Sequence, residues 1–186
     1  MDDQNLKDLE REQADNQLIG DAFQHLLDTY LSSRHRKKVD IVTKAFNFAR
    51  QAHKGVRRLS GEPYIMHPIA VAQIACEEMG LGSTSICAAL LHDVVEDTSV
   101  TIEELEKEFP TEVTDALRLL THIKGTDYFE YVRSIRQNPI AKAVKLADIA
   151  HNSDETRLSG SLDVSEEKKA YLRNKYVRAR KILEEG

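Results

Sequence analysis

The chain has 186 residues, of which 41% are hydrophobic and 31% are charged, and its net charge is −5. This length and composition predict one globular domain with a sizeable hydrophobic core. The negative charge argues against a general nucleic-acid binder, and no apolar run approaches the roughly 20 residues that a membrane-spanning helix needs.

Hydrophobic residues recur at helical spacing along most of the chain, whereas no segment alternates in the manner of a strand. Residues 1–16 are polar and acidic, and we expect them to be frayed. Helices are predicted at residues 18–31, 39–53, 111–122, 127–137, 139–152 and 165–184. The sequence therefore predicts an all-α fold.

Local signals predict further helices between residues 53 and 111. Pro68 begins a helix that Gly80 ends, and Ser83 or Thr84 is expected to cap the next, strongly apolar helix. Thr101 begins a capping box for a short acidic helix. These signals place most of the middle of the chain in helices.

The apolar run at 85–97 also contains His92 and Asp93. Read as a helix, the run packs one stripe in the core while its neighbouring turns present an imidazole and a carboxylate. A buried carboxylate is costly unless it is paired, and a divalent cation satisfies it while it stays charged. The pair therefore indicates part of a metal site, although a hydrogen-bonded pair on a helix surface is the simpler alternative.

Two further ligands are available at similar positions elsewhere in the chain. His67 stands just before Pro68, at the start of a helix, and Asp148 lies in an apolar helical run, one turn from Lys145 and from Asn152. Two imidazoles and two carboxylates form a mixed nitrogen and oxygen set that suits Mn²⁺, Fe²⁺ or Zn²⁺.

The order of these residues resembles the H…HD…D signature of HD-domain metal-dependent phosphohydrolases. Four segments are similar to the hydrolase domain of the RelA/SpoT alarmone enzymes and their small stand-alone relatives, and they lie at residues 52–55, 58–68, 88–98 and 145–152. The resemblance covers roughly residues 40–158. It implies an all-α HD-domain bundle.

The resemblance also implies roles for individual residues. One metal, in this family usually Mn²⁺, is expected to be bound by His67, His92, Asp93 and Asp148. Glu96 and Asp97 match the pair that acts on the attacking water and the scissile phosphate, although exposed acids near a helix end are the alternative. The nucleotide and its phosphates are expected to contact Arg58, Ser60, Lys145 and Asn152.

The chain departs from the family pattern near the expected nucleotide site. Leu59 stands where the family has lysine, Ile149 stands where it has arginine, and an acidic stretch at 153–155 replaces Met-Arg-Thr. We expect less positive charge there to weaken binding of a heavily phosphorylated ligand. His53 is expected either to contact phosphate or to pack at a helix end, and His151 to be structural or exposed.

The implied function is metal-dependent hydrolysis of a nucleotide, with the 3′-pyrophosphate of (p)ppGpp-like alarmones as the expected leaving group. Two alternatives stay open: an NADPH phosphatase or adenine-alarmone hydrolase, and a non-catalytic nucleotide-sensing module. We expect a polar tail and leading helix at 1–36, the HD domain at 37–158, and a linker with a C-terminal helix at 159–186.

The N-terminus and the cysteines indicate a cytoplasmic location. Residues 1–5 lack the basic and apolar regions of a secretory signal. Cys76 and Cys87 lie in apolar runs and are too far apart for a Cys-x-x-Cys site, so we expect reduced core residues. The only partner expected is a small nucleotide, not nucleic acid or a membrane.

Overall fold

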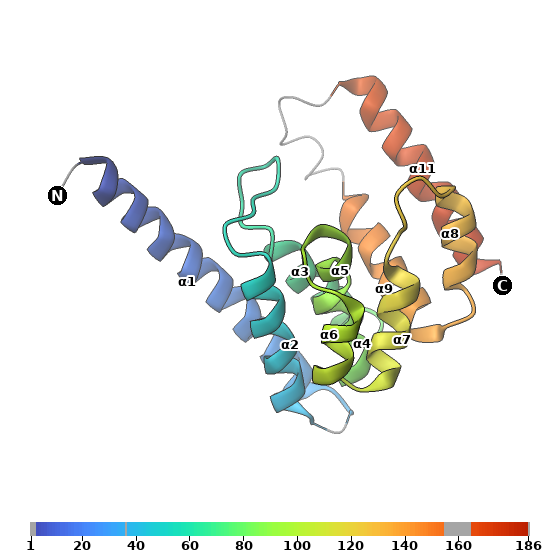
Figure 1. The fold of residues 1–186 in the computed structure, drawn as a ribbon, viewed down its shortest axis with the longest axis horizontal. Coiled ribbons are helices and arrows are strands. Elements are labelled where there is room, and N and C mark those ends of the chain that lie inside the picture. Colours follow the sequence, from blue (N-terminus) through green and yellow to red (C-terminus); the bar gives the residue numbers. More distant parts are fainter. Residues whose placement is uncertain (1–2, 36, 155–164, 186) are drawn as a thin grey trace.

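The computed structural model describes residues 3–35, 37–154 and 165–185. Within these ranges the chain is mainly helical, and an isolated bridge between Arg57 and Pro63 is the only strand-like pairing. In chain order the helices are α1 (Asp3–Ser32), α2 (Val39–Ala52), α3 (Met66–Glu77), α4 (Ser83–Leu91), α5 (Val94–Asp97), α6 (Ile102–Glu108), α7 (Thr111–Leu120), α8 (Tyr128–Ile135), α9 (Pro139–Asn152) and α11 (Glu166–Glu184), as Figure 1 shows. The predicted all-α bundle is confirmed.

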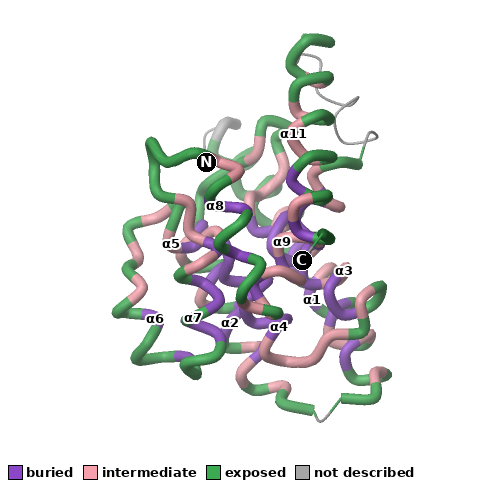
Figure 2. The backbone as a smooth tube through the Cα atoms, turned by 90° about the vertical axis from the view of Figure 1, so that its right-hand side faces the viewer, coloured by how far each residue is buried: buried purple, intermediate pink, exposed green. Residues whose placement is uncertain are grey.

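Helix α4 forms the centre of the bundle. Every residue from Ser85 to Leu91 is buried, and α4 contacts α2, α3, α7 and α9. Its side chains are small or branched and apolar all round, which is the pattern of a helix that its neighbours enclose. Figure 2 shows buried residues gathered along these helices and exposed residues at the periphery. The C-terminal end of α4 therefore brings the residues that follow it into the core.

Helix α1 is much longer than predicted. We expected residues 1–16 to be frayed, but the helix begins at Asp3, and its N-terminal half stands out from the body of the molecule (Figure 1). The second half buries Ile19, Phe23, Leu26 and Tyr30 against the core. Because adding residues to an existing helix costs little, the good helix formers before residue 18 extend it without burial.

The expected continuous helix around His92 and Asp93 is interrupted. Helix α4 ends at Leu91, the two residues form a turn, and α5 begins at Val94. The predicted cap by Ser83 or Thr84 is also wrong, because Gly82 occupies the N-cap position without a side-chain hydrogen bond.

The capping box at Thr101 is confirmed. Its hydroxyl accepts from the backbone N–H of Glu104, whose carboxylate accepts from the backbone N–H of Thr101. This reciprocal pair satisfies two donors at the start of α6.

Helix α11 packs on α8 and α9 (Figure 1). Ala179 and Leu183 are buried, and the Arg178 guanidinium lies 3.9 Å from the ring centroid of Phe129. The predicted linker at 160–164 lies outside the described residues. The division of the chain after residues 36 and 158 stays a prediction.

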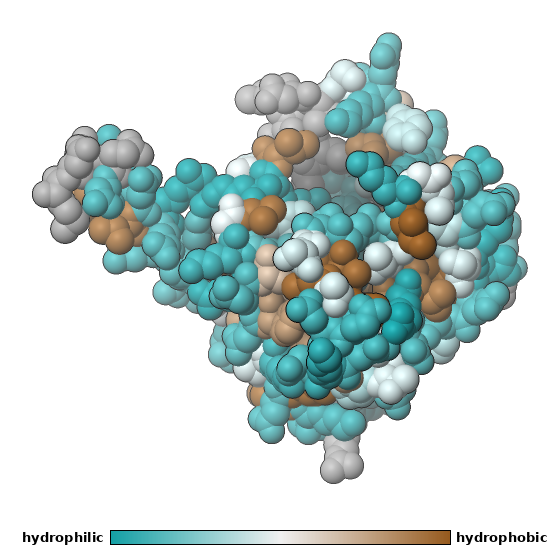
Figure 3. Space-filling model, in the orientation of Figure 1, coloured by the Kyte–Doolittle hydropathy of each residue, from teal (hydrophilic) through white to brown (hydrophobic). Residues whose placement is uncertain are grey.

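The face drawn in Figure 3 is largely hydrophilic, with small separate hydrophobic areas. Among the helices described, none combines the length and the apolar composition needed to cross a bilayer. Cys76 and Cys87 are both buried and free of disulfides, as expected. Burial raises the pKa of the Cys87 thiol to about 12, so it stays protonated and unreactive.

Candidate metal centre and nucleotide site

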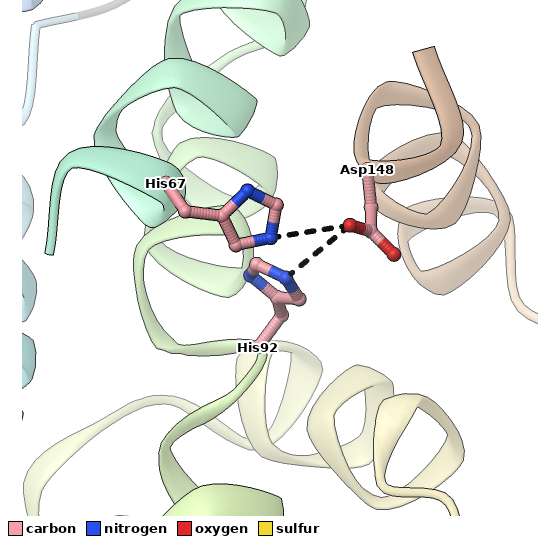
Figure 4. Close-up of side chains that lie close together, drawn as sticks. All are labelled: His67, His92 and Asp148. Atoms are coloured by element: carbon pink, nitrogen blue, oxygen red, sulfur yellow. Dashed lines mark ion pairs between the residues drawn. The ribbon is translucent and has the colours of Figure 1, made fainter. Parts of the chain in front are cut away.

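Three buried side chains from separate parts of the chain meet in the core. His67 lies in the first turn of α3, His92 directly follows α4, and Asp148 lies in α9. Oδ1 of Asp148 is 3.2 Å from Nε2 of His67 and 3.9 Å from Nε2 of His92 (Figure 4). One potential ligand atom from each residue lies within 4.8 Å of the other two, so the three can share one cation.

Hydrogen bonds orient both imidazoles so that Nε2 faces the cluster. Nδ1 of His92 lies 2.7 Å from the carbonyl oxygen of Ala89. Because a carbonyl only accepts, Nδ1 carries the proton and Nε2 presents a lone pair. Nδ1 of His67 lies 2.7 Å from Nδ1 of His151. Burial lowers the pKa of His67, although Asp148 acts in the opposite direction. The lowered pKa favours the neutral imidazole, which is the form that binds metals.

Asp148 is held charged by its neighbours on α9. Burial alone would raise the pKa of this carboxyl, but the ammonium of Lys145, 2.8 Å from Oδ2, holds it well below its usual range. Asn152 donates to Oδ1 across 2.6 Å. Since the three residues are spaced by single helical turns, their contact follows directly from the predicted helix. The result is an ionised carboxylate with a set orientation.

Asp93 completes the group of predicted ligands. Its Oδ1 is 3.2 Å from Nε2 of His92 and its Oδ2 is 3.5 Å from Nε2 of His67. The Tyr64 hydroxyl lies 2.7 Å from Oδ2 of Asp93 and 2.6 Å from Oδ2 of Asp97, and it donates its single proton to one of them at a time. Burial and these carboxylates raise the pKa of Tyr64, so the hydroxyl keeps that proton.

The cluster fits a divalent cation. Ligand bonds of about 2.0–2.2 Å place neighbouring ligand atoms roughly 3–4 Å apart, which matches the distances among these four residues. Nε2 of His92 is buried and makes no hydrogen bond within the described part of the chain. Two carboxylates that face imidazole lone pairs repel them unless a cation lies between, so the donor set is suited to a metal.

The two predicted catalytic acids lie on the short helix α5, and both are exposed. Oε2 of Glu96 accepts from the backbone N–H of His122 across 3.0 Å, which anchors this carboxylate to the segment after α7. Asp97 is joined to the metal-ligand candidate Asp93 through the Tyr64 hydroxyl. The turn that separates α5 from α4 therefore places the two acids at the solvent side of the cluster.

Of the four predicted substrate-binding residues, three lie together. Lys145 and Asn152 contact Asp148, and Nη2 of Arg58 donates to Oδ1 of Asn152 across 3.2 Å. Nη1 of Arg58 is buried without a hydrogen-bond partner in the described chain, so it is available to a ligand. Ser60 is exposed in the loop between α2 and α3 and is not brought to this group by any contact described.

The departures from the family pattern have different structural consequences. Leu59 is 87% exposed in the loop, where a longer cationic side chain fits without strain. Ile149 is only 2% exposed and packs in the core, so a cation at this position would itself have to be buried. A loss of positive surface charge can therefore arise at Leu59 and not at Ile149, and the acidic stretch at 153–155 lies partly outside the described residues.

A family model for the HD domain matches residues 45–157, which contain all four predicted metal ligands. The chain belongs to the HD-domain family.

Curated proteins to which this chain is similar include alarmone enzymes. The chain is 36% identical over 153 residues to the bifunctional (p)ppGpp synthase/hydrolase SpoT of Escherichia coli, which covers 76% of this chain and 21% of that protein. It is 42% identical over 125 residues to the guanosine-3′,5′-bis(diphosphate) 3′-pyrophosphohydrolase of Haemophilus influenzae. This match covers 61% of this chain and 18% of that protein. The chain thus spans about a fifth of the length of these curated relatives.

A solved structure shows the same architecture. It belongs to a metazoan ortholog of SpoT that hydrolyzes ppGpp and plays a role in starvation responses. The two structures agree with a TM-score of 0.65 at 26% sequence identity, over 81% of this chain and 96% of the other. The all-α HD-domain fold is therefore shown by both the sequence and the structure.

Two residues of the HD-domain site were not singled out from the sequence. Tyr64 links Asp93 to Asp97, and His151, expected to be structural or exposed, is buried against His67. Tyr64 lies inside the motif that ends in His67, which was an available signal. His151 had the same kind of signal, since it lies in the similar segment at 145–152, but its contact with His67 depends on how α3 packs against α9.

His53 is buried at the C-terminal end of α2. Of the two expectations for it, packing at a helix end describes its position, and contact with phosphate stays a prediction. Its ring centroid is 4.7 Å from that of Tyr64, and both ring nitrogens lack hydrogen-bond partners in the described chain. It also lines a cavity of about 660 Å³ between α1, the end of α2 and the loop that follows. None of the predicted metal-binding, catalytic or substrate-binding residues lines this cavity.

Proposed function

We propose that this protein is a Mn²⁺-dependent nucleotide phosphohydrolase that removes the 3′-pyrophosphate of (p)ppGpp. The observation that carries the proposal is the convergence of His67, His92, Asp93 and Asp148 on one buried point. Relatives that are named ppGpp 3′-pyrophosphohydrolases support the substrate. The mixed nitrogen and oxygen ligands are compatible with Mn²⁺ and also with Fe²⁺ or Zn²⁺. We further infer a cytoplasmic enzyme whose partner is the nucleotide and not nucleic acid or a membrane.

The residues around the cluster have separate roles in the proposed reaction. A divalent cation bound by the four ligands supplies activation of water and neutralisation of phosphate charge. Glu96, anchored by the His122 N–H, orients the attacking water and accepts its proton. The water oxygen bonds to phosphorus as the bond from phosphorus to the ribose 3′ oxygen breaks. Arg58 and Lys145 bind phosphate oxygens, and the leaving ribose 3′ oxygen takes a proton from solvent to become the hydroxyl of GDP.

A nucleotide panel tests this function. The Mn²⁺-loaded protein is incubated with ppGpp, ppApp and NADPH, and the products are separated by anion-exchange chromatography. We expect GDP and pyrophosphate from ppGpp, and no product after chelation of the metal. Phosphate release from NADPH alone would identify an NADPH phosphatase, and binding without any product would identify a sensing module.

Leu59→Lys is expected to lower the KM for ppGpp with little change in kcat. The side chain at this position is exposed, so a lysine there adds a cation to the loop that carries Arg58. An exposed charge pair contributes up to about 1 kcal/mol, which corresponds to a KM roughly two- to fivefold lower. Such a contact stabilises ground and transition states equally, so kcat stays the same.

Leu31→Lys is the matched control for this prediction, because Leu31 is also an exposed leucine and lies at the end of α1. The control should leave both constants unchanged. A KM that stays constant or rises in Leu59→Lys would show that the chain already holds ppGpp without a cation at this position.

A further inference from the structure

Lys175 of α11 is a partly buried cation that lies on an aromatic face. Its Nζ lies 3.9 Å from the ring centroid of Tyr128 and 6.0 Å from that of Tyr176. No ion pair of Lys175 occurs among the residues that the structure describes, although other lysines of α11 pair with nearby glutamates. Contact with an aromatic face leaves ammonium hydrogens free to donate to another group.

The ring under Lys175 adjoins the ring that Lys145 contacts. The centroids of Tyr128 and Tyr131 are 6.0 Å apart, and Nζ of Lys145 lies 5.5 Å from the centroid of Tyr131. Burial lowers the pKa of the Lys175 ammonium and the charge of Lys145 lowers it further, whereas Asp148 and Glu96 act in the opposite direction. The two ammonium groups therefore lie on neighbouring rings of α8, and among the residues described only Lys145 pairs with a carboxylate. This arrangement is costly in the free protein and becomes favourable when an anion binds between the cations.

The adjacent residue on α11 faces the same region. Burial raises the pKa of Tyr176 and Asp148 adds to this, whereas Lys145 and Arg58 oppose it. Contacts connect three cations from different parts of the fold. Arg58, from the loop before α3, and Lys145, from α9, are joined through Asn152 and Asp148. Lys175, from α11, lies on the ring of Tyr128, next to the Tyr131 ring that Lys145 contacts. Arg58 also has a buried Nη1 without a partner in the described chain.

We propose that Lys175 binds substrate phosphates beyond the one at the metal, so that α11 forms one wall of the substrate site. The proposal rests on the function proposed above and deepens it, because it makes a multiply phosphorylated nucleotide the preferred ligand. Lys175 is a specificity-determining residue, and it takes no part in proton transfer.

Substitution of Lys175 tests the proposal through KM. Lys175→Met keeps an unbranched apolar chain against Tyr128 and removes the charge. A charge-assisted hydrogen bond to phosphate is worth enough to raise the KM for ppGpp roughly tenfold, while kcat changes by less than about twofold. Lys175→Arg should restore most of the affinity. The control is Lys181→Met, because Lys181 is exposed in the last turn of α11 and pairs with Glu185.

A binding measurement separates this inference from the proposed activity. Calorimetric titration of ppGpp into Glu96→Gln, and into Glu96→Gln combined with Lys175→Met, measures affinity without relying on turnover. We expect about tenfold weaker binding in the double variant, with the same melting temperature in both proteins. If the melting temperature falls, Lys175→Gln, which keeps a polar end group, replaces the methionine variant.

Equal affinity and equal KM in the presence and absence of the Lys175 charge would overturn the inference even if the wild type hydrolyses ppGpp. A fall in kcat with unchanged KM would overturn it as well. Failure of the wild type to hydrolyse any nucleotide would instead contradict the proposed function, while a tenfold difference in ppGpp affinity would still support the role of Lys175. Absence of ppGpp binding by the wild type would overturn both.

Discussion

Asp148→Asn is expected to abolish both metal binding and hydrolysis, although it only replaces one carboxylate oxygen by an amide NH2 group. Asp148 faces both Nε2 atoms and carries the negative charge that Lys145 maintains. An amide is a weak neutral ligand, so the remaining groups lose both charge balance and geometry. Alanine is a poorer test, because it also removes the oxygens that accept from Lys145 and Asn152, whereas asparagine keeps one acceptor oxygen and nearly the same volume.

The measurement is metal content by mass spectrometry after Mn²⁺ loading, together with turnover of ppGpp. We expect less than about a tenth of the wild-type metal and turnover lower by roughly a thousandfold or more. His92→Ala should behave in the same way. Asp115→Asn, which changes an exposed aspartate of α7, should leave both quantities unchanged. Full metal occupancy and normal turnover in Asp148→Asn and His92→Ala would disprove the metal centre.

Glu96→Gln is expected to lower kcat by about two to four orders of magnitude while metal content stays the same. The amide cannot accept the proton of the attacking water. Its carbonyl oxygen still accepts from the His122 N–H, so the contact that anchors α5 is kept. This variant therefore separates loss of the general base from loss of the metal.

Stopped-flow or discontinuous assays over a range of pH measure kcat for this variant. Glu103→Gln provides the control, since it makes the same change at an exposed position in the first turn of α6. Turnover within about threefold of the wild type would show that Glu96 is an exposed helix residue without a catalytic role. Water activation would then be due to the other groups at the site.

Helices with strong local signals were predicted closely from the sequence. Asn138 and Pro139 begin α9 at the expected residue, because an N-cap side chain and a proline in the first turn favour a helix start whatever surrounds them. The same holds for Thr101 and α6. The prediction was wrong in the first half of α1, where the residues are polar and no apolar periodicity indicates a helix.

The candidate ligands were recognisable from the sequence, but their surroundings were not. The order of His67, His92, Asp93 and Asp148 is a property of the chain, and the contacts of Lys145 and Asn152 with Asp148 follow from helical spacing. The motif alone does not show which residue contacts the ring nitrogen of His67 that points away from the cluster. The contact of His151 with His67 requires α3 and α9 to pack together.

By itself, the sequence determined the all-α class, most helix boundaries and the set of candidate metal ligands, because these depend on periodicity, capping and residue type within a few turns. Only the tertiary structure decided that a turn separates α4 from α5, that Tyr64 lies between Asp93 and Asp97, that Ile149 is buried, and that α11 places Lys175 on the ring of Tyr128. These features join residues that are far apart along the chain. Their positions depend on which helix faces pack together, and packing is set by the whole core.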